Sequence, residues 1–303
     1  MRPEISIVVP LYEAEDRVVA LHSELSATRA TLPPFELLLV DDGSRDATWP
    51  RIVELAAADP AVVGVRLARN VGQTGALCAG FTLARGEVVV LMDDDLDTGP
   101  AEITRFVDAV RAGAEFASGR RMGTRSPVRH LGSRLYNARL RRWGLPFHDA
   151  GCGTNALTRD LATRIAAEGW GVRQHRFKPR VAQLTDRIVE VPFQVRPTSG
   201  SHHNVRTLAA SWLDVELTFG SLTPGRWMLA AVVAPLVAAA TLGRRALRTR
   251  RRRGPAAAGA AVLTGGGLAA LDLLLLQQRA DRRDAQRPPF EVAQVVGGAD
   301  AGS

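Results

Sequence analysis

The chain has 303 residues, 46% of them hydrophobic, which gives room for one large folded domain or two smaller ones. Its formal net charge of +8 indicates a polyanionic partner, either nucleic acid or an anionic membrane surface. The only cysteines are Cys78 and Cys152, which excludes a disulfide framework and a cysteine-based metal site.

Apolar runs alternate with helix-length segments through the first part of the chain. We expect strands at residues 4–10, 35–40, 62–67 and 87–92, and helices at residues 15–29, 48–58 and 71–84. The pattern continues with a helix at 101–112, strands at 115–118 and 188–195, and helices at 135–143 and 158–168. Strands and helices alternating at this spacing predict an α/β domain with a mostly parallel, doubly wound sheet.

The strand expected at residues 87–92 ends at a cluster of acidic residues. Five apolar residues, 88–92, precede Asp93, Asp94 and Asp95. Neighbouring carboxylates repel one another unless they are solvated or neutralised by a cation, and ligands of open α/β sheets bind at the carboxyl ends of strands. Hard oxygen ligands suit Mg²⁺ or Mn²⁺ carrying a diphosphate. The alternative is a solvated acidic turn.

Two other strand ends carry related signals. The first expected strand is followed by Leu11 and Tyr12 after Pro10, and the second is followed by residues 41–44, Asp-Asp-Gly-Ser. In a parallel sheet these ends meet the acidic cluster at one edge. In this order and spacing, residues 4–205 resemble family 2 glycosyltransferases, which have the GT-A fold.

That resemblance implies roles for individual residues. It assigns the nucleotide to Pro10, Tyr12, Glu13, Val40, Asp42 and Asp94. It assigns a metal ion, Mg²⁺ or Mn²⁺, to Asp93 and Asp95. Glu13 stands next to the position where the family commonly has a glutamate, so a base-binding carboxylate is displaced to Glu13 or lost. For Asp41 the alternative is a turn-forming carboxylate that bonds its own loop.

Further segments are similar to one subgroup of that family, the polyprenyl-phosphate sugar transferases typified by dolichyl-phosphate mannose synthase. They lie at residues 70–73, 99–102, 119–121, 149–153, 175–177 and 190–201. The acidic pair and the QxxRW motif of members with sugar acceptors are absent from the sequence, and an anionic lipid phosphate needs cations rather than a general base. The resemblance implies catalytic roles for Asp93, Asp95, Arg121 and Arg196, and phosphate or acceptor contacts for Arg129, Arg134, Arg176 and Ser199.

The character of the sequence changes after about residue 205. We expect a catalytic domain at residues 1–204, an amphipathic interface helix and linker at 205–226, two apolar helices joined by an arginine-rich loop at 227–278, and a polar, disordered tail at 279–303. The apolar runs cover residues 227–242 and 256–276, and the second is long enough to span a bilayer.

The sequence is compatible with more than one membrane topology. The amino terminus has no signal-peptide core, so we expect the first domain to be cytosolic. Two spans would then place the seven arginines of residues 244–253 outside, against the positive-inside rule. Three arrangements remain: two spans that break the rule, a re-entrant or interfacial first run with the arginines on the anionic inner leaflet, or two soluble core helices.

These features predict an inverting glycosyltransferase that moves a sugar from a nucleotide diphosphate sugar to a polyprenyl phosphate. We expect it at the cytoplasmic face of the cell membrane, with membrane lipids as partners and without nucleic acid. One alternative is a glycosyltransferase with a soluble or polysaccharide acceptor and Asp149 as general base. Another is a non-catalytic membrane protein that binds nucleotide sugars. The sugar, the nucleotide base and the oligomeric state stay open.

Overall fold

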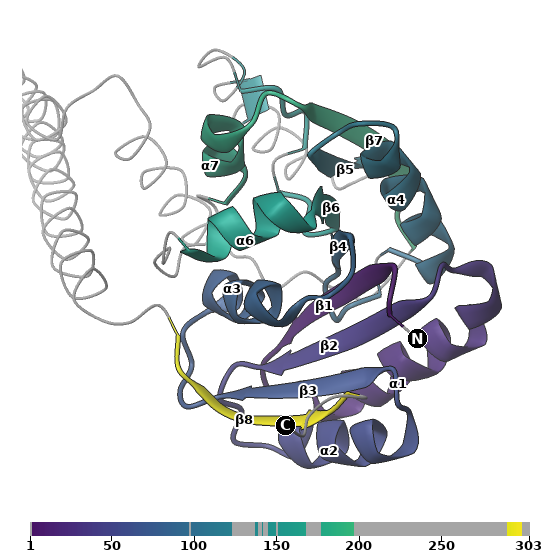
Figure 1. Cartoon of the computed structure of the whole chain (residues 1–303), viewed down its shortest axis with the longest axis vertical. Helices are drawn as coiled ribbons and strands as arrows, with labels where there is room; N and C mark the ends of the chain where they lie inside the picture. Colours follow the sequence, from purple (N-terminus) through teal and green to yellow (C-terminus); the bar gives the residue numbers. More distant parts are fainter. Residues whose placement is uncertain are drawn as a thin grey trace, which may run out of the picture. The chain divides into compact units, whose positions relative to one another are not determined.

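A computed structural model of the chain describes residues 2–96, 98–122, 137–138, 141, 145–149, 151–167, 177–196 and 290–298 (Figure 1). These residues belong to one compact unit, formed by Met1–His202 together with Pro288–Ser303. No helix within the described ranges combines the length and the apolar character that a membrane crossing requires. The expected interface helix at 205–226 and the apolar helices at 227–278 lie outside the described residues.

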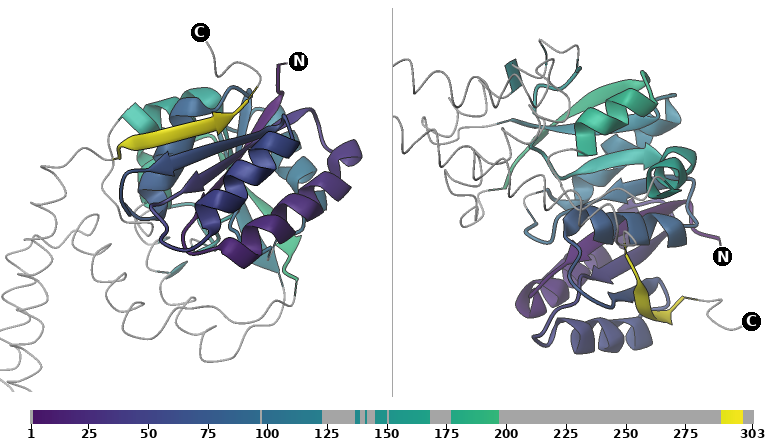
Figure 2. Two further views of the ribbon diagram at one scale, coloured as in Figure 1. Left: turned by 90° about the horizontal axis from the view of Figure 1, so that it is seen from below. Right: turned by 90° about the vertical axis from the view of Figure 1, so that its left-hand side faces the viewer.

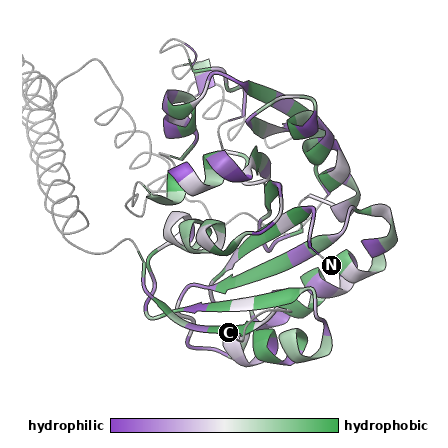
Figure 3. Cartoon of the chain, viewed as in Figure 1, coloured by the Kyte–Doolittle hydropathy of each residue, from purple (hydrophilic) through white to green (hydrophobic). Residues whose placement is uncertain are grey.

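An eight-stranded mixed sheet forms the centre of this unit, in the order β7-β5-β6-β4-β1-β2-β3-β8. Its strands are β1 (Ile5–Leu11), β2 (Phe35–Asp41), β3 (Val62–Leu67), β4 (Val88–Leu91), β5 (Phe116–Met122), β6 (Asn155–Thr158), β7 (Ile188–Gln194) and β8 (Val292–Gly297). The central strands are mostly apolar and buried because helices cover both faces of the sheet (Figures 2 and 3).

Two groups of helices provide that cover. The α-helices are α1 (Glu15–Ala27), α2 (Thr48–Ala58), α3 (Gln73–Leu83), α4 (Ile103–Arg111), α6 (Arg159–Ala167) and α7 (Phe177–Leu184), with 3₁₀ turns η1 (Arg29–Thr31) and η2 (Pro100–Glu102). Ile5, Ile7 and Val9 of β1 join a core cluster with α1, α2 and α4, whereas Val8 joins a second cluster with α3, α6 and α7. This alternation follows from the two-residue period of a strand.

The strand directions bring several strand ends to one edge of the sheet. β1 is parallel to β2 and β4, β2 is parallel to β3, and β5 is parallel to β7. β6 is antiparallel to both β4 and β5, and its first residue, Asn155, lies opposite Leu91 at the end of β4 and Ser118 within β5. We call this the carboxyl edge, formed by the carboxyl ends of β1, β2, β4 and β5 and the start of β6.

The first four expected strands are confirmed within one residue at either end. The expected helix at 71–84 begins only at Gln73, because Gly72 has a φ of +86° that a helix does not allow. Sequence patterns missed β6 and α7, and β5 extends four residues beyond the strand expected at 115–118. β6 has only four residues, too few for a periodic signal, and it forms because β4 and β5 flank it.

The carboxyl-terminal tail was expected to be disordered, but part of it forms β8, which pairs antiparallel with β3. Val296 lies opposite Gly64, where an added Cβ would come within 2.8 Å of the valine Cγ2. Val296 also packs against the core cluster that contains Ile52 of α2. The absence of a side chain at Gly64 therefore makes room for a strand that follows β3 by more than 220 residues.

Val296→Asp is expected to lower the free energy of unfolding by about 1–3 kcal/mol, because it places an unpaired carboxylate against the core cluster. Val295→Asp is the matched control, since the neighbouring side chain is 41% exposed. Urea denaturation of both variants measures the difference. Equal effects of the two substitutions would contradict the packing of β8 on β3.

Candidate active site

Two aspartates hold the turn after β2. Asp41 Oδ1 accepts a hydrogen bond from the Ser44 N–H at 2.9 Å, so Asp41 forms the turn, as the alternative interpretation of the sequence proposed. The buried carboxylate of Asp42 accepts the N–H groups of Val71 at 2.7 Å and Gly72 at 2.8 Å. Burial raises the pKa of Asp42 to about 6, although these hydrogen bonds lower it. Asp42 thus braces the loop before α3, and its contact with a nucleoside stays a prediction.

The loop after β1 lies beside this turn. Pro10 is opposite Val40 in the β1–β2 register, and the Val40 side chain is buried in the core. A nucleoside at the carboxyl edge would therefore meet Val40 through its main chain. The Glu13 N–H donates to Ser44 Oγ at 3.0 Å, and the Tyr12 side chain is 42% exposed. Tyr12 and Glu13 are thus held next to the β2 turn, as the predicted nucleotide site requires.

The acid cluster follows β4 at the same edge. Asp93 Oδ1 accepts a hydrogen bond from Gln73 Nε2 of α3 at 2.7 Å. Its carboxylate lies against Gly153, where an added Cβ would stand 1.8 Å from Asp93 Oδ2. Because of this close approach, position 153 needs a residue without a side chain. Gly153 belongs to the segment that leads into β6. The fold therefore places Asp93 between α3 and the loop before β6.

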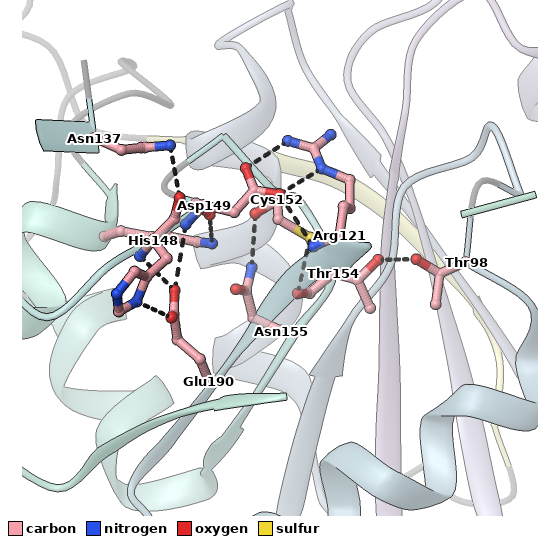
Figure 4. Close-up of polar contacts among 10 residues, drawn as sticks. Thr98, Arg121, Asn137, His148, Asp149, Cys152, Thr154, Asn155 and Glu190 are labelled. Atoms are coloured by element: carbon pink, nitrogen blue, oxygen red, sulfur yellow. Dashed lines mark hydrogen bonds and ion pairs between the residues drawn. The ribbon is translucent and has the colours of Figure 1, made fainter. Parts of the chain in front are cut away.

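The other two aspartates of the cluster have different surroundings. Asp94 accepts a hydrogen bond from Arg17 Nε of α1 at 2.8 Å. Asp95 is exposed. The hydroxyls of Thr98 and Thr154, 2.6 Å apart, connect the chain just after the cluster to the chain just before β6 (Figure 4). This contact ties the acid cluster to the start of β6.

The electrostatics of the cluster fit a divalent cation. Burial, followed by the charges of Asp95 and Asp94, raises the pKa of Asp93 to about 6. A cation would relieve that repulsion, and carboxylate oxygens are the ligands that Mg²⁺ and Mn²⁺ prefer. The described residues contain no group of three or more His, Cys, Asp or Glu side chains that could hold one metal ion by themselves. A cation on Asp93 and Asp95 would complete its coordination with diphosphate oxygens and water.

Asp93→Asn is expected to stabilise the metal-free protein in a pH-dependent way. The pKa of the Asp93 carboxyl is about 6 in the folded protein, against 3.8 for an unperturbed aspartate. Ionisation of Asp93 therefore lowers the stability of the fold above about pH 6. This cost disappears as the pH falls toward 4. We expect the melting temperature to rise by about 2–4 °C at pH 7.5 and by less at pH 5.

Thermal denaturation in a chelating buffer measures this effect. Asp160→Asn, at an exposed position on α6, is the matched control and should leave the melting temperature unchanged. An equal gain for Asp93→Asn at both pH values would contradict the raised pKa of Asp93.

Arg121 and Asp149 form a two-pronged ion pair at the end of β5. Arg121 Nε lies 2.8 Å from Asp149 Oδ2, and Nη2 lies 2.9 Å from Oδ1 (Figure 4). Burial alone would lower the pKa of Arg121, but the Asp149 carboxylate raises it, so the guanidinium stays charged. Its charge lowers the pKa of Asp93, which places Arg121 within electrostatic range of the acid cluster.

The turn that carries Asp149 is itself held by buried and partly buried polar groups. Glu190 Oε1 of β7 accepts the N–H groups of His148 at 2.6 Å and Asp149 at 3.3 Å (Figure 4). Lys178 Nζ of α7 donates to the Asp149 carbonyl at 2.9 Å, and Asn137 Nδ2 donates to the His148 carbonyl at 2.7 Å. These groups fix the position of Asp149 and, through it, that of Arg121.

Sequence reasoning did not assign Lys178 or Glu190 to the site. A signal for Lys178 was available, because it is the only lysine in an arginine-rich chain. It is 3% exposed, and burial lowers its pKa. Glu190 belongs to a segment of the family resemblance, but the sequence gives no indication that it accepts main-chain N–H groups from residues more than 40 positions away.

Arg196 has a different environment from the one its expected catalytic role implies. Arg196 Nη1 donates to Glu24 Oε2 of α1 at 2.6 Å, and its guanidinium packs on Gly99. Arg196 Nη1 is thus engaged by Glu24, and the catalytic role of Arg196 stays a prediction. The expected phosphate and acceptor residues Arg129, Arg134, Arg176 and Ser199 lie outside the described residues.

The family to which this site belongs follows from sequence comparison. The family model described as glycosyl transferase family 2 matches residues 6–164, just over half of the chain. The chain belongs to glycosyl transferase family 2. The match runs from β1 to α6 and contains the acid cluster, Arg121 and Asp149. It confirms the family on which the resemblance of residues 4–205 was based.

Curated relatives of the chain include sugar transferases described by an undecaprenyl-phosphate acceptor, in line with the resemblance to the polyprenyl-phosphate subgroup. The undecaprenyl-phosphate 4-deoxy-4-formamido-L-arabinose transferase of Pectobacterium atrosepticum is 36% identical over 166 residues, which cover 53% of this chain and 50% of the relative. The enzyme of the same description from Shewanella sediminis is 38% identical over 162 residues, covering 52% and 49%. The chain thus spans about half the length of the curated relatives that it matches.

Solved structures confirm the fold. Glucosyl-3-phosphoglycerate synthase from Mycobacterium tuberculosis, in complex with phosphoglyceric acid, is similar with a TM-score of 0.51 and 21% identity, covering 74% of this chain and 82% of that chain. Its complex with Mn²⁺, uridine diphosphate and glucosyl-3-phosphoglycerate gives a TM-score of 0.51 at 22% identity, covering 71% and 77%. The family 2 chain therefore has the GT-A fold with a mostly parallel, mixed sheet.

Proposed function

We propose that this protein is an inverting glycosyltransferase that moves a sugar from a nucleotide diphosphate sugar to a polyprenyl phosphate. The observation that carries the proposal is that Asp93 and the Asp149-bound Arg121 both lie against the segment 151–153 at the carboxyl edge. An acid cluster for a cation and a fixed positive charge beside it suit a reaction between two phosphate groups. Family 2 membership and the similarity to undecaprenyl-phosphate transferases support this choice.

The donor site follows from the acid cluster. Asp93 and Asp95 would hold Mg²⁺ or Mn²⁺, and the bound metal would supply Lewis-acid stabilisation of the leaving diphosphate. Gln73 keeps the Asp93 carboxylate in place by donating to Oδ1. Tyr12 and Glu13 lie at the same edge and would contact the nucleoside.

The acceptor chemistry explains why a general base is unnecessary. A polyprenyl phosphate oxygen is already anionic and attacks the anomeric carbon on the side opposite the diphosphate. The new carbon–oxygen bond forms as the bond to the diphosphate breaks, and the nucleoside diphosphate leaves with the electron pair. Arg121 holds positive charge next to the reacting phosphates, and Asp149 fixes its orientation.

The rival enzyme hypothesis uses Asp149 as general base for a soluble or polysaccharide acceptor. Both carboxylate oxygens of Asp149 accept hydrogen bonds from Arg121. A carboxylate in a two-pronged ion pair is a weak base, because the guanidinium stabilises its charged form. The contacts of Asp149 therefore favour a positioning role over proton abstraction.

Incubation of the purified protein with Mn²⁺, radiolabelled nucleotide sugars and undecaprenyl phosphate tests the proposal. Label in the organic extract, dependent on the lipid and on the metal, is the expected result. Label on a water-soluble acceptor would favour the rival enzyme, and nucleotide-sugar binding without turnover would favour a non-catalytic protein.

We also propose that the protein acts at the cytoplasmic face of the cell membrane, where a polyprenyl phosphate is accessible. The apolar runs at residues 227–242 and 256–276 and the arginines of 244–253 support membrane association. Recovery of the full chain in the membrane fraction, with residues 2–196 accessible to protease only from the cytoplasmic side, is the expected result. Recovery in the soluble fraction would contradict it.

A further inference from the structure

Arg17 connects two loops of the carboxyl edge. It lies in the first turn of α1 and donates through Nε to Asp94 Oδ2 at 2.8 Å. Through Nη2 it donates to the carbonyl oxygens of Tyr12 at 3.4 Å and Glu13 at 3.2 Å. A planar guanidinium has several N–H groups in fixed directions, so one side chain serves a carboxylate and two carbonyls. Arg17 therefore ties the loop after β1 to the acid cluster after β4.

The same loop is fastened on its other side to the segment after β2. The Glu13 N–H donates to Ser44 Oγ at 3.0 Å, and the Ala14 N–H donates to Thr48 Oγ1 at 2.8 Å. Glu13 has a φ of +47°, in a region that residues other than glycine rarely occupy. Such a conformation persists where the surroundings impose it. Here Arg17 binds the carbonyl oxygens of the loop, and the hydroxyls of Ser44 and Thr48 bind its N–H groups. Together they hold Glu13 in this conformation.

Stability alone is a poor explanation for the Arg17–Asp94 pair. The Arg17 side chain is 45% exposed and the Asp94 side chain 21%, and ion pairs this open to solvent contribute little to folding. Its effect on local charge is larger, because Asp94 is the middle one of three consecutive aspartates. The pairing of Asp94 with Arg17 reduces the negative charge of the triplet that a divalent cation has to balance before an anionic diphosphate arrives.

We propose that Arg17 is a positioning residue of the donor site, and that it prepares the carboxyl edge for a nucleoside diphosphate carried by a divalent cation. It cancels the surplus charge of Asp94 and fixes the loop that presents Tyr12 and Glu13. The inference rests on the proposed function, since it assumes that the donor binds at this edge. It concerns donor binding and leaves the chemical step to Asp93, Asp95 and Arg121.

Arg17→Ala is expected to raise the KM for the nucleotide sugar about tenfold and to change kcat by no more than about twofold. Calorimetric titration with UDP or GDP in the presence of Mn²⁺ should show the same loss of affinity in the absence of turnover. Arg17→Lys should recover part of it, because the charge returns without the planar fork. Arg51→Ala is the matched control, since Arg51 pairs with Glu54 on the surface of α2.

The double variant Arg17→Ala, Asp94→Ala separates the charge effect from a structural one. We expect it to bind Mn²⁺ and nucleotide more tightly than Arg17→Ala alone, because the uncompensated carboxylate is gone. Strictly additive losses, or a lower melting temperature with unchanged nucleotide affinity, would overturn the role of Arg17. If the wild-type protein binds nucleotide with Mn²⁺ but transfers no sugar, the proposed function fails, and the titrations still decide the role of Arg17.

Discussion

Asp93→Ala is expected to reduce sugar transfer by about 10²–10³-fold, because it removes one of the two carboxylates proposed to hold the cation at the leaving diphosphate. The loss should appear mainly in kcat at saturating donor. Asp95→Ala should behave similarly, and a chelator should abolish the activity of the wild-type protein until Mg²⁺ or Mn²⁺ is returned. Initial rates of label transfer to undecaprenyl phosphate measure all three effects.

Folding of these variants has to be established separately, because Asp93 accepts a hydrogen bond from Gln73. A circular dichroism spectrum and a melting temperature equal to those of the wild type, or a higher melting temperature, would exclude misfolding. Asp108→Ala, at an exposed position on α4, is the matched control and should retain full activity. Full turnover of Asp93→Ala would remove the acid cluster from the mechanism.

Arg121→Ala is expected to lower sugar transfer by about 10²–10³-fold, because the site loses the fixed positive charge next to the two phosphates. Asp149→Asn should produce a smaller loss, since Arg121 keeps its charge but loses its two-pronged partner. The double variant should be no worse than Arg121→Ala, because Asp149 acts through Arg121. Steady-state rates of the wild type, the two single variants and the double variant form a double-mutant cycle that measures this coupling.

The general-base hypothesis makes the opposite prediction for the same variants. If Asp149 removed a proton from the acceptor, Asp149→Asn would abolish turnover and the acidic limb of the pH profile would disappear with it. Under that hypothesis, Asp149→Asn would also reduce turnover further when it is combined with Arg121→Ala. Arg187→Ala is the matched control for arginine removal, because Arg187 pairs with Glu115 at an exposed position away from the carboxyl edge.

Local sequence patterns were sufficient for the first half of the fold. The apolar runs of β1 to β4 are buried on both faces, so their strands are visible without knowledge of their partners. The direction of parallel strands then placed Tyr12, the β2 turn and Asp93 at one edge. The turn-forming role of Asp41 was also foreseeable, because an aspartate can bond the main chain three residues on.

The remaining features depend on partners that are distant in the sequence. β6 is too short to show a period in its hydrophobic residues. β8 forms because the Val296 side chain packs over Gly64, which has no side chain. The ion pair of Arg121 with Asp149 joins residues 28 positions apart, and that of Arg17 with Asp94 joins residues 77 positions apart. In an arginine-rich chain, composition gives no indication of which arginine meets which carboxylate.

The position of β8 limits how the chain can be arranged at a bilayer. Residues 2–196 and 290–298 belong to one folded body, so the segment between them leaves that body and returns to it. Both ends of that segment therefore lie on the same side of any bilayer that the chain meets. If the proposed membrane association involves spanning helices between residues 197 and 289, the pairing of β8 with β3 therefore requires an even number of them.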